Sequence, residues 1–243
     1  MSCRNCCPIT RNYIGNTAWD LRYRNGYTGG CAGGYGTHSG TTSFEFNSTF
    51  HGICGNWASY VNTYSGFSVD WIGSVGVTVC KSGFHGEGRA FDLSQIRFTS
   101  GNYFDMNVEW RESCTSLRWI RAYVATAASL RRYCGTVITA WYNTDHHNHI
   151  HFDNGVAVQP IRPSWRTDTT LVQAACKYMN GESLTIDGDW GPITEAAYGR
   201  LRTKLRMGCR NPKTSTADAL LFLHLLANAG FKGQAAGYYV GPC

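Results

Sequence analysis

The sequence has few charged residues and no long apolar run, and both absences limit what the protein can be. Asp, Glu, Lys and Arg make up 16% of the chain, while hydrophobic residues make up 43%. This balance supports a packed core and argues against global disorder. No stretch approaches the roughly 18 apolar residues of a membrane-spanning helix, so we expect no membrane span. The first ten residues also lack the apolar segment of a signal peptide, so no export route is visible.

The chain also lacks a concentrated basic segment. Its formal net charge is +6. Residues 1–165 contain thirteen Lys and Arg against ten Asp and Glu, and residues 166–243 contain nine against six. Nucleic-acid binding usually depends on a basic stripe, so this even distribution argues against it. The excess fits weak attraction to an anionic polymer such as a bacterial wall, and it fits ordinary solubility equally well.

Cysteines are abundant, but they do not form the two C-x-x-C pairs of a structural zinc site. The chain has 11 of them, and most are scattered as in a disulfide framework. Cys3, Cys6 and Cys7 form a cluster for which terminal disulfides and a metal site are the alternatives. An odd number leaves at least one thiol free or bonded to another chain. We therefore expect an oxidising location, extracellular or periplasmic.

The first two thirds of the chain mix strand and helix patterns. Residues 11–50 are rich in Gly, Thr, Tyr and Asn, which favours loops and short strands. Alternation over Val75–Val79 predicts a strand with one buried face. Apolar residues at steps of three and four over 117–128 predict an amphipathic helix that ends by Gly135, and residues 136–142 have a strand composition. This part is therefore expected to mix α and β structure.

Turn-forming residues between 154 and 168 separate this part from a helical region. Asn154-Gly155, Pro160 and Pro163 break regular structure. Helical patterns follow at 171–178, from Thr194, as a capping residue, to about 202, and at 217–229. We predict an α+β protein with two domains: residues 1–160 with a small antiparallel sheet and flanking helices, and residues 166–243 with three helices.

Two short histidine-containing runs carry the chemistry. They span residues 83–93 and 145–153 and hold five of the eight histidines. His149 and His151 are two positions apart, so on a strand both side chains project from one face. His85 and Asp92 can supply further donors from a glycine-rich turn. Catalytic zinc takes three protein ligands and leaves a position for water, which these residues would satisfy.

The pattern His-x-x-Gly-x-Ala-x-Asp followed by His-x-His resembles zinc peptidases of the D-Ala-D-Ala carboxypeptidase and L-Ala-D-Glu endopeptidase superfamily. Within this group, the second run is similar to the extensin-like C-terminal family and to the penicillin-insensitive murein endopeptidases. The resemblance covers about residues 50–155. It implies that His85, Asp92 and His151 bind zinc.

The same resemblance implies roles for neighbouring residues. His149 would be the general base, and His146 would assist proton transfer or stabilise an oxyanion. The carboxypeptidase branch has an acidic base three residues before the last ligand, where this chain has Asn148. The base is therefore expected to be a histidine or an acid such as Asp145. Arg89 is a candidate for binding a substrate carboxylate, with a surface role as the alternative, and Lys81 lies where relatives often carry a substrate-binding arginine.

The C-terminal region resembles the three-helix peptidoglycan-binding domain of many wall hydrolases. The resemblance is carried by Asp187-Gly188-Asp189-Trp190-Gly191-Pro192-Ile193-Thr194, in which we expect Trp190 mainly to pack against the core. Together the two resemblances imply a monomeric zinc peptidase that cuts peptidoglycan peptides at the bacterial cell wall, as an endopeptidase. A D-Ala-D-Ala type carboxypeptidase and a catalytically inert wall-binding protein are the alternatives. The sequence leaves open whether the source is a phage, a secreted or an injected protein.

Overall fold

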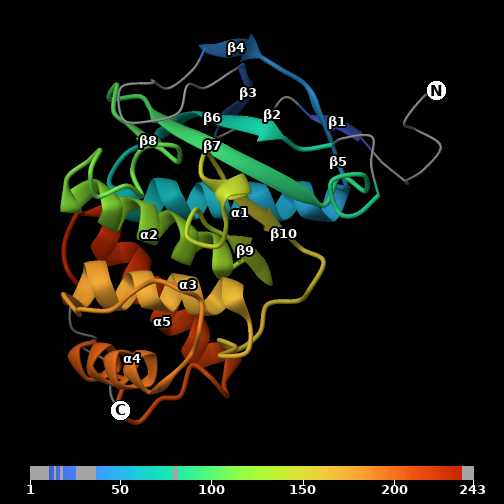
Figure 1. The fold of residues 1–243 in the computed structure, drawn as a ribbon. Helices are drawn as coiled ribbons and strands as arrows, with labels where there is room; N and C mark the ends of the chain where they lie inside the picture. The colour runs from blue at the N-terminus through green and yellow to red at the C-terminus, as the bar shows by residue number, and fades with distance from the viewer. Residues whose placement is uncertain (1–10, 14, 17–18, 26–36, 79–81, 237–243) are drawn as a thin grey trace.

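The computed structural model describes residues 11–13, 15–16, 19–25, 37–78 and 82–236, and it shows a sheet on one side with helices stacked beneath it (Figure 1). The predicted α+β class is confirmed. The strands are β1 (Arg11–Tyr13), β2 (Gly15–Asn16), β3 (Trp19–Asn25), β4 (Thr37–Thr41), β5 (Phe44–Phe46), β6 (Val69–Gly76), β7 (Ala90–Phe98), β8 (Tyr103–Asp105), β9 (Thr136–Ile138) and β10 (Ile150–Asp153). The helices are α1 (Ser48–Ser65), α2 (Leu117–Arg131), α3 (Arg166–Ala174), α4 (Pro192–Lys204) and α5 (Thr216–Phe231).

The main sheet is mixed rather than purely antiparallel. Its strand order is β2-β3-β6-β7-β10-β9, with β4 on β3 and β8 on β7. All of these pairs are antiparallel except β3 and β6, which run parallel with Leu21 opposite Ile72. The prediction of an antiparallel sheet was wrong at this pair. Parallel neighbours need a long crossover, and the segment between β3 and β6 contains α1.

Some predicted boundaries also shift. Of the strand expected at Val75–Val79, only Val75 and Gly76 belong to a strand, at the end of β6, and Val79 lies outside the described residues. The chain leaves the sheet there because it turns into the loop that carries His85, and the Val77 carbonyl is used by that histidine instead of by a neighbouring strand. The strand expected over 136–142 is only β9, whereas the helix predicted from residue 117 is α2.

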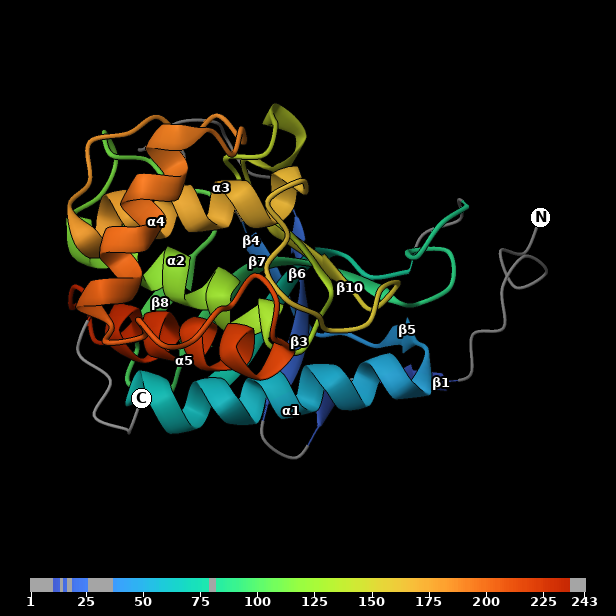
Figure 2. The same ribbon diagram turned by 90° about the horizontal axis from the view of Figure 1, so that it is seen from below.

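An aromatic core fixes the central strands to the helices below them. Phe91 of β7 and Phe152 of β10 stack at a ring-centroid distance of 5.3 Å. Phe152 also contacts Phe50 and Trp57 of α1, at 5.7 and 5.9 Å. The Trp57 indole donates to Ser129 of α2 at 2.9 Å, which joins the two helices. β7 and β10 are therefore packed on α1, which runs along the lower side of the view in Figure 2.

The C-terminal region forms the three predicted helices, α3, α4 and α5, with a π-helical turn, Ala175–Met179, that extends α3. Thr194 does not cap α4, because Gly191 is the capping residue and Pro192 occupies the first turn. Thr194 is buried instead, and its hydroxyl accepts a hydrogen bond from Gln173 at 3.0 Å. Trp190 packs against Tyr198 as expected, at 5.3 Å.

The helical region packs directly on the first part of the chain. Gly230 of α5 lies so close to α2 that an added Cβ would be 2.4 Å from the Arg121 carbonyl oxygen. Arg131 of α2 forms a buried ion pair with Asp168 of α3, at 2.8 Å. One continuous hydrophobic core includes buried residues of both parts. The change of composition near residue 160 therefore marks an irregular connection across which the core continues.

Cysteines of the described residues occur both as disulfides and as thiols. Cys114 and Cys209 are disulfide-bonded. Cys54, Cys134 and Cys176 are buried free thiols. The predicted cluster of Cys3, Cys6 and Cys7 lies outside the described residues. Among the helices that the structure describes, none is long and apolar enough to cross a membrane.

Candidate metal centre

The strands β7 and β10 place two of the three predicted ligands opposite each other. Asp92 on β7 and His151 on β10 are direct cross-strand partners in the antiparallel register. Their side chains project from the same face of the sheet, because residues paired in this way face the same side. The two predicted donors therefore meet although 59 residues separate them in the chain.

The turn that follows β6 brings His85 to this pair. His85 Nε2 lies 3.2 Å from Asp92 Oδ1 and 3.2 Å from His151 Nδ1, and His151 Nδ1 lies 2.9 Å from the same carboxylate oxygen. Donor atoms of the three residues all lie within 4.8 Å of one another. The three predicted metal ligands thus converge on a space of the size that a single ion requires.

Glycines allow this close approach. An added Cβ on Gly76 would lie 3.1 Å from Asp92 Oδ2, so a side chain there would crowd the carboxylate. Gly88 has a φ of 64° and lies against the backbone of Asn47, where a Cβ would be 2.9 Å from the amide nitrogen. Only glycine adopts such a conformation at low cost, which agrees with the prediction of a tight glycine turn before Asp92.

A second layer of acceptors orients the imidazoles. His85 Nδ1 lies 2.6 Å from the Val77 carbonyl oxygen, which can only accept, so Nδ1 donates there and Nε2 faces the cluster. His151 Nε2 lies 3.2 Å from Asp153 Oδ2, and Asp153 is itself held by the Gly155 amide at 2.8 Å. Histidine ligands of metals typically donate their second N–H in this way.

Hydrogen bonds within the cluster shift the pKa values of Asp92 and His151 so that a positive charge is held beside a carboxylate. Burial alone would raise the pKa of Asp92, but hydrogen bonds from His151 and His85 outweigh burial and lower it. Burial alone would lower the pKa of His151, but its hydrogen bonds to Asp153 and Asp92 raise it to about 9. Two carboxylates therefore hold a positive charge at His151, and a metal ion could replace that proton.

His149 approaches the cluster without belonging to the three-residue donor set. Its Nε2 lies 3.5 Å from Asp92 Oδ1, and its Nδ1 donates to Asn148 Oδ1 at 2.7 Å. Burial is the main reason that the pKa of His149 falls to about 4. The ring is therefore neutral near pH 7, with an unprotonated nitrogen facing the site.

His146 forms the outer wall of the site. It lies in the 3₁₀ turn Thr144–His146, with its ring centroid 5.0 Å from that of His149 and 6.0 Å from that of His151. Its Nδ1 contacts Asn143 Oδ1 at 2.5 Å. Partial burial is the main cause of its lowered pKa. The structure thus brings His146 and His149 together with the three donors, whereas the alternative base Asp145 is exposed.

Arg89 is already engaged by the protein. Its Nε and Nη2 donate to the side chain and the carbonyl of Asn154, each at 3.0 Å, and Nη1 pairs with Glu87 at 2.9 Å. The guanidinium also lies over the Phe84 ring. These contacts join the His85 turn to the end of β10, and they agree with the surface role considered for Arg89. Lys81 lies outside the described residues.

Two further residues that hold the histidines of the site in place were not predicted. Asp153 follows His151 by two positions on β10, so the His-x-Asp spacing on a strand was a usable signal. Trp110 comes from the loop after β8, and its indole N–H donates to the His147 carbonyl oxygen at 2.8 Å. Nothing in the sequence around Trp110 links it to the second histidine run.

Comparison with known families gives a match for one part of the chain. Residues 74–161 match the family model of the extensin-like protein C-terminus. This segment carries the three donors, both further histidines and Trp110, whereas β1 to β5, α1 and the three C-terminal helices lie outside it. No curated protein and no solved structure matches the chain.

Proposed function

We propose that the protein is a zinc-dependent peptidase that cleaves peptide bonds in bacterial peptidoglycan, acting as an endopeptidase. The observation that carries the proposal is the convergence of His85, Asp92 and His151, with the outer nitrogens of both imidazoles bound to acceptors. Structural zinc sites usually have four protein ligands, while catalytic sites have three and an open position. Two histidines and one carboxylate correspond to the second kind.

The residues present fit zinc by their chemistry. Imidazole and carboxylate are suitable donors, and the carboxylate is ionised because its pKa is lowered. When bound, zinc would lower the pKa of a coordinated water to about 7 and polarise a carbonyl group. Asp153 would keep His151 in the orientation that points Nδ1 inward.

The other two histidines are suited to proton transfer. His149 presents a neutral, unprotonated Nε2 to the cluster, so it can accept a proton there. Asn148 has no basic group, but its amide oxygen accepts the Nδ1 proton of His149 and fixes the ring. His146 lies one ring further out, where it can assist by passing on a proton that it has first received.

The C-terminal helices support a wall polymer as the substrate. The Asp187–Thr194 loop on which the resemblance rests lines a cavity of about 330 Å³ between α3 and the start of α4. The side chain of Ile193 beside it is 70% exposed. We propose that this part of the chain attaches the enzyme to peptidoglycan.

The test is digestion of purified sacculi from several wall chemotypes with the full chain, with and without a chelator, followed by mass analysis of released fragments. Endopeptidase activity releases fragments cut within the stem peptides or cross-links, whereas carboxypeptidase activity releases single terminal residues. The absence of chelator-sensitive release from every chemotype would exclude the peptidase and leave the inert wall-binding protein.

Single substitutions separate metal binding from proton transfer. His151→Ala should lose zinc and activity together, whereas His149→Ala should keep most of the zinc and lose activity. Asp70→Asn changes an exposed carboxylate on β6 and is the control, with both properties retained. Full activity of His149→Ala would show that another group is the base.

A further inference from the structure

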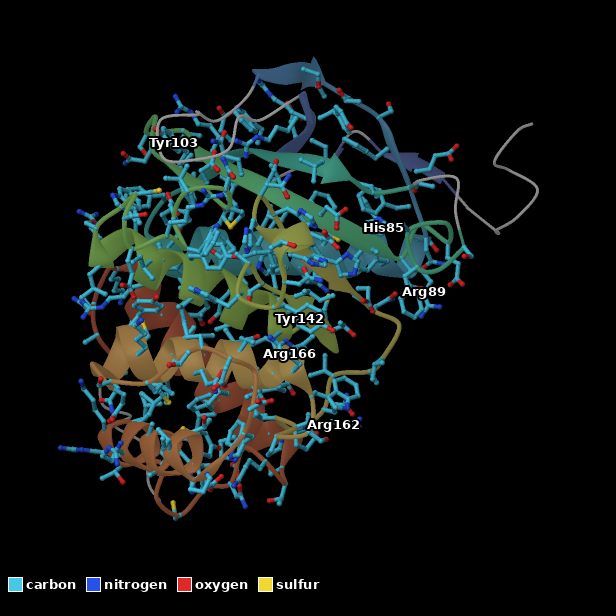
Figure 3. All side chains as sticks on the ribbon, in the orientation of Figure 1. His85, Arg89, Tyr103, Tyr142, Arg162 and Arg166 are labelled. Atoms are coloured by element: carbon cyan, nitrogen blue, oxygen red, sulfur yellow. The ribbon has the colours of Figure 1, made fainter. Side chains whose placement is uncertain are left out.

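Two exposed arginines and two aromatic residues form a ridge between the metal centre and the C-terminal helices. The ridge consists of Tyr142, Arg162, Trp165 and Arg166. The Arg166 guanidinium lies 5.8 Å from the Tyr142 ring centroid, and its Nε donates to the Tyr142 carbonyl at 3.3 Å. The Arg162 guanidinium lies 4.3 Å from the Trp165 ring. Figure 3 shows Tyr142 and Arg166 close together below His85, with Arg162 further along.

The ridge is continuous with the metal centre. The Tyr142 ring meets the His146 ring edge to face, with centroids 6.1 Å apart, and His146 in turn lies against His149 and His151. At its other end, Arg166 packs over Gly188 of the Asp187–Thr194 loop, where an added Cβ would be 2.7 Å from the arginine side chain. A chain bound at the metal centre and extending toward the C-terminal helices would therefore cross Tyr142 and Arg166, and Trp165 directly precedes Arg166 in the sequence.

The arginine charges on the ridge are less neutralised than others nearby. Arg131, Arg200 and Arg210 form ion pairs with Asp168, Glu182 and Asp218. Among the described residues, neither the Arg162 nor the Arg166 guanidinium forms an ion pair, although the Arg162 backbone amide donates to Asp168 at 2.8 Å. Arg162 donates to the neutral side chain of Gln159. Asp187 is close enough to Arg166 to feel its charge, but its carboxylate accepts from Gln173 and from the Asp189 amide.

Stacking determines what such arginines can bind. A guanidinium held over an aromatic ring presents N–H groups at its edges, and those not engaged by Tyr142 and Gln159 can pair with a carboxylate. The stacking also fixes the side chain, so less conformational entropy is lost when a ligand binds. The pair at Trp165 and the pair at Tyr142 are therefore suited to anionic groups presented along an extended chain.

We propose that this ridge binds free carboxylates of the substrate beside the bond that is cut. This inference rests on the proposed function, which supplies the substrate class: an acidic peptide attached to a wall polymer. The ridge would hold the peptide carboxylates between the metal centre and the wall-binding helices. Walls whose peptide carboxylates are amidated would then be poorer substrates.

The experiment measures binding separately from cleavage. Full-length protein with chelator is sedimented with sacculi that have either free or amidated peptide carboxylates. The test variant is Arg162→Gln/Arg166→Gln. The control is Arg118→Gln/Arg200→Gln, which removes two exposed charges elsewhere, one of them also over a tryptophan.

We expect the test variant to bind free-carboxylate sacculi about three- to tenfold more weakly, as two exposed ion pairs would imply. The control should bind like the unaltered protein, and all three should bind amidated sacculi equally weakly. Three outcomes would each contradict the proposed role of the ridge. The test variant could bind free-carboxylate sacculi as well as the unaltered protein, it could lose as much binding on amidated as on free-carboxylate sacculi, or the unaltered protein could fail to bind sacculi.

Cleavage gives a second reading that separates the two proposals. With zinc present, the test variant should lose kcat/KM on free-carboxylate sacculi, but not on soluble peptides too short to reach the ridge. If the protein binds sacculi through the ridge but releases no fragments, the proposed peptidase activity is contradicted, whereas the proposed carboxylate binding by the ridge is supported.

Discussion

The Trp110 indole N–H donates to the His147 carbonyl oxygen at 2.8 Å, while the two rings lie 4.6 Å apart. Arg111 covers the same indole. Trp110 therefore holds His147, in the short segment that joins His146, the last residue of the 3₁₀ turn, to His149, just before β10. Because that segment has little regular structure, this single tryptophan is a positioning residue for the two histidines proposed to move protons.

Trp110→Phe should lower activity while leaving zinc binding intact. Phenylalanine keeps the ring contact but removes the N–H, so the histidine segment can shift, and small displacements of reacting groups cost on the order of tenfold or more in rate. Steady-state cleavage and zinc content would be measured together. Trp119→Phe, at another partly buried tryptophan, is the control, and a fall in zinc content in Trp110→Phe would mean that Trp110 supports the ligands instead.

Asp153→Asn should weaken zinc binding by about 10- to 100-fold, the usual effect of removing a carboxylate that orients a histidine ligand. The amide keeps the size of the side chain and can still accept from Gly155, but it lacks the charge that holds the His151 N–H. Zinc affinity would be measured by competition with a chromophoric chelator. Unchanged affinity would show that Asp153 has only a structural role at the end of β10.

Glu109→Gln should stabilise the protein in alkaline but not in acidic solution. Burial raises the pKa of Glu109 well above its ordinary value of 4.5, so the folded protein keeps a proton that the unfolded chain releases. The stability contributed by this group is complete below pH 4.5 and is lost as pH rises toward the folded pKa. We expect a gain of about 1–3 kcal/mol at pH 8 and little change at pH 4.

Urea denaturation at both pH values measures this difference. Glu112→Gln is the matched control, because Glu112 is exposed and its hydrogen bond from Lys177 lowers its pKa. That variant should show a small effect of opposite sign. The same change for Glu109→Gln at pH 4 and pH 8 would contradict a buried, protonated carboxyl.

Asp168→Asn should destabilise the whole chain by about 3–5 kcal/mol, because it leaves the buried charge of Arg131 without its partner. Since one core includes both parts of the chain, unfolding should stay a single transition when followed by fluorescence and by far-UV circular dichroism. Two separate transitions, with only the later residues destabilised, would show that the C-terminal helices fold independently.

The structure brings together His85, Asp92 and His151, the three ligands that the resemblance implied, while their binding of zinc stays a prediction. His149 lies just before β10 rather than on it, so of the two histidines only His151 is on the strand, and a glycine turn explains how His85 reaches Asp92. Trp110 could not be inferred, since only the tertiary fold places its loop beside His147. The prediction that Thr194 caps the helix was wrong because the helix starts earlier, at Gly191-Pro192. Thr194 is buried instead and accepts a hydrogen bond from Gln173.

The Arg131–Asp168 pair and the close contact of Gly230 with α2 leave no flexible tether between the metal centre and the C-terminal helices. A tethered module raises the local concentration of substrate but lets the catalytic part sample many positions along a polymer. If both proposals hold, the distance from the wall-attachment site to the cleavage site is constant here. The point at which the enzyme attaches to the wall would then determine which bond it can reach, and polymers with another repeat length would not be cut.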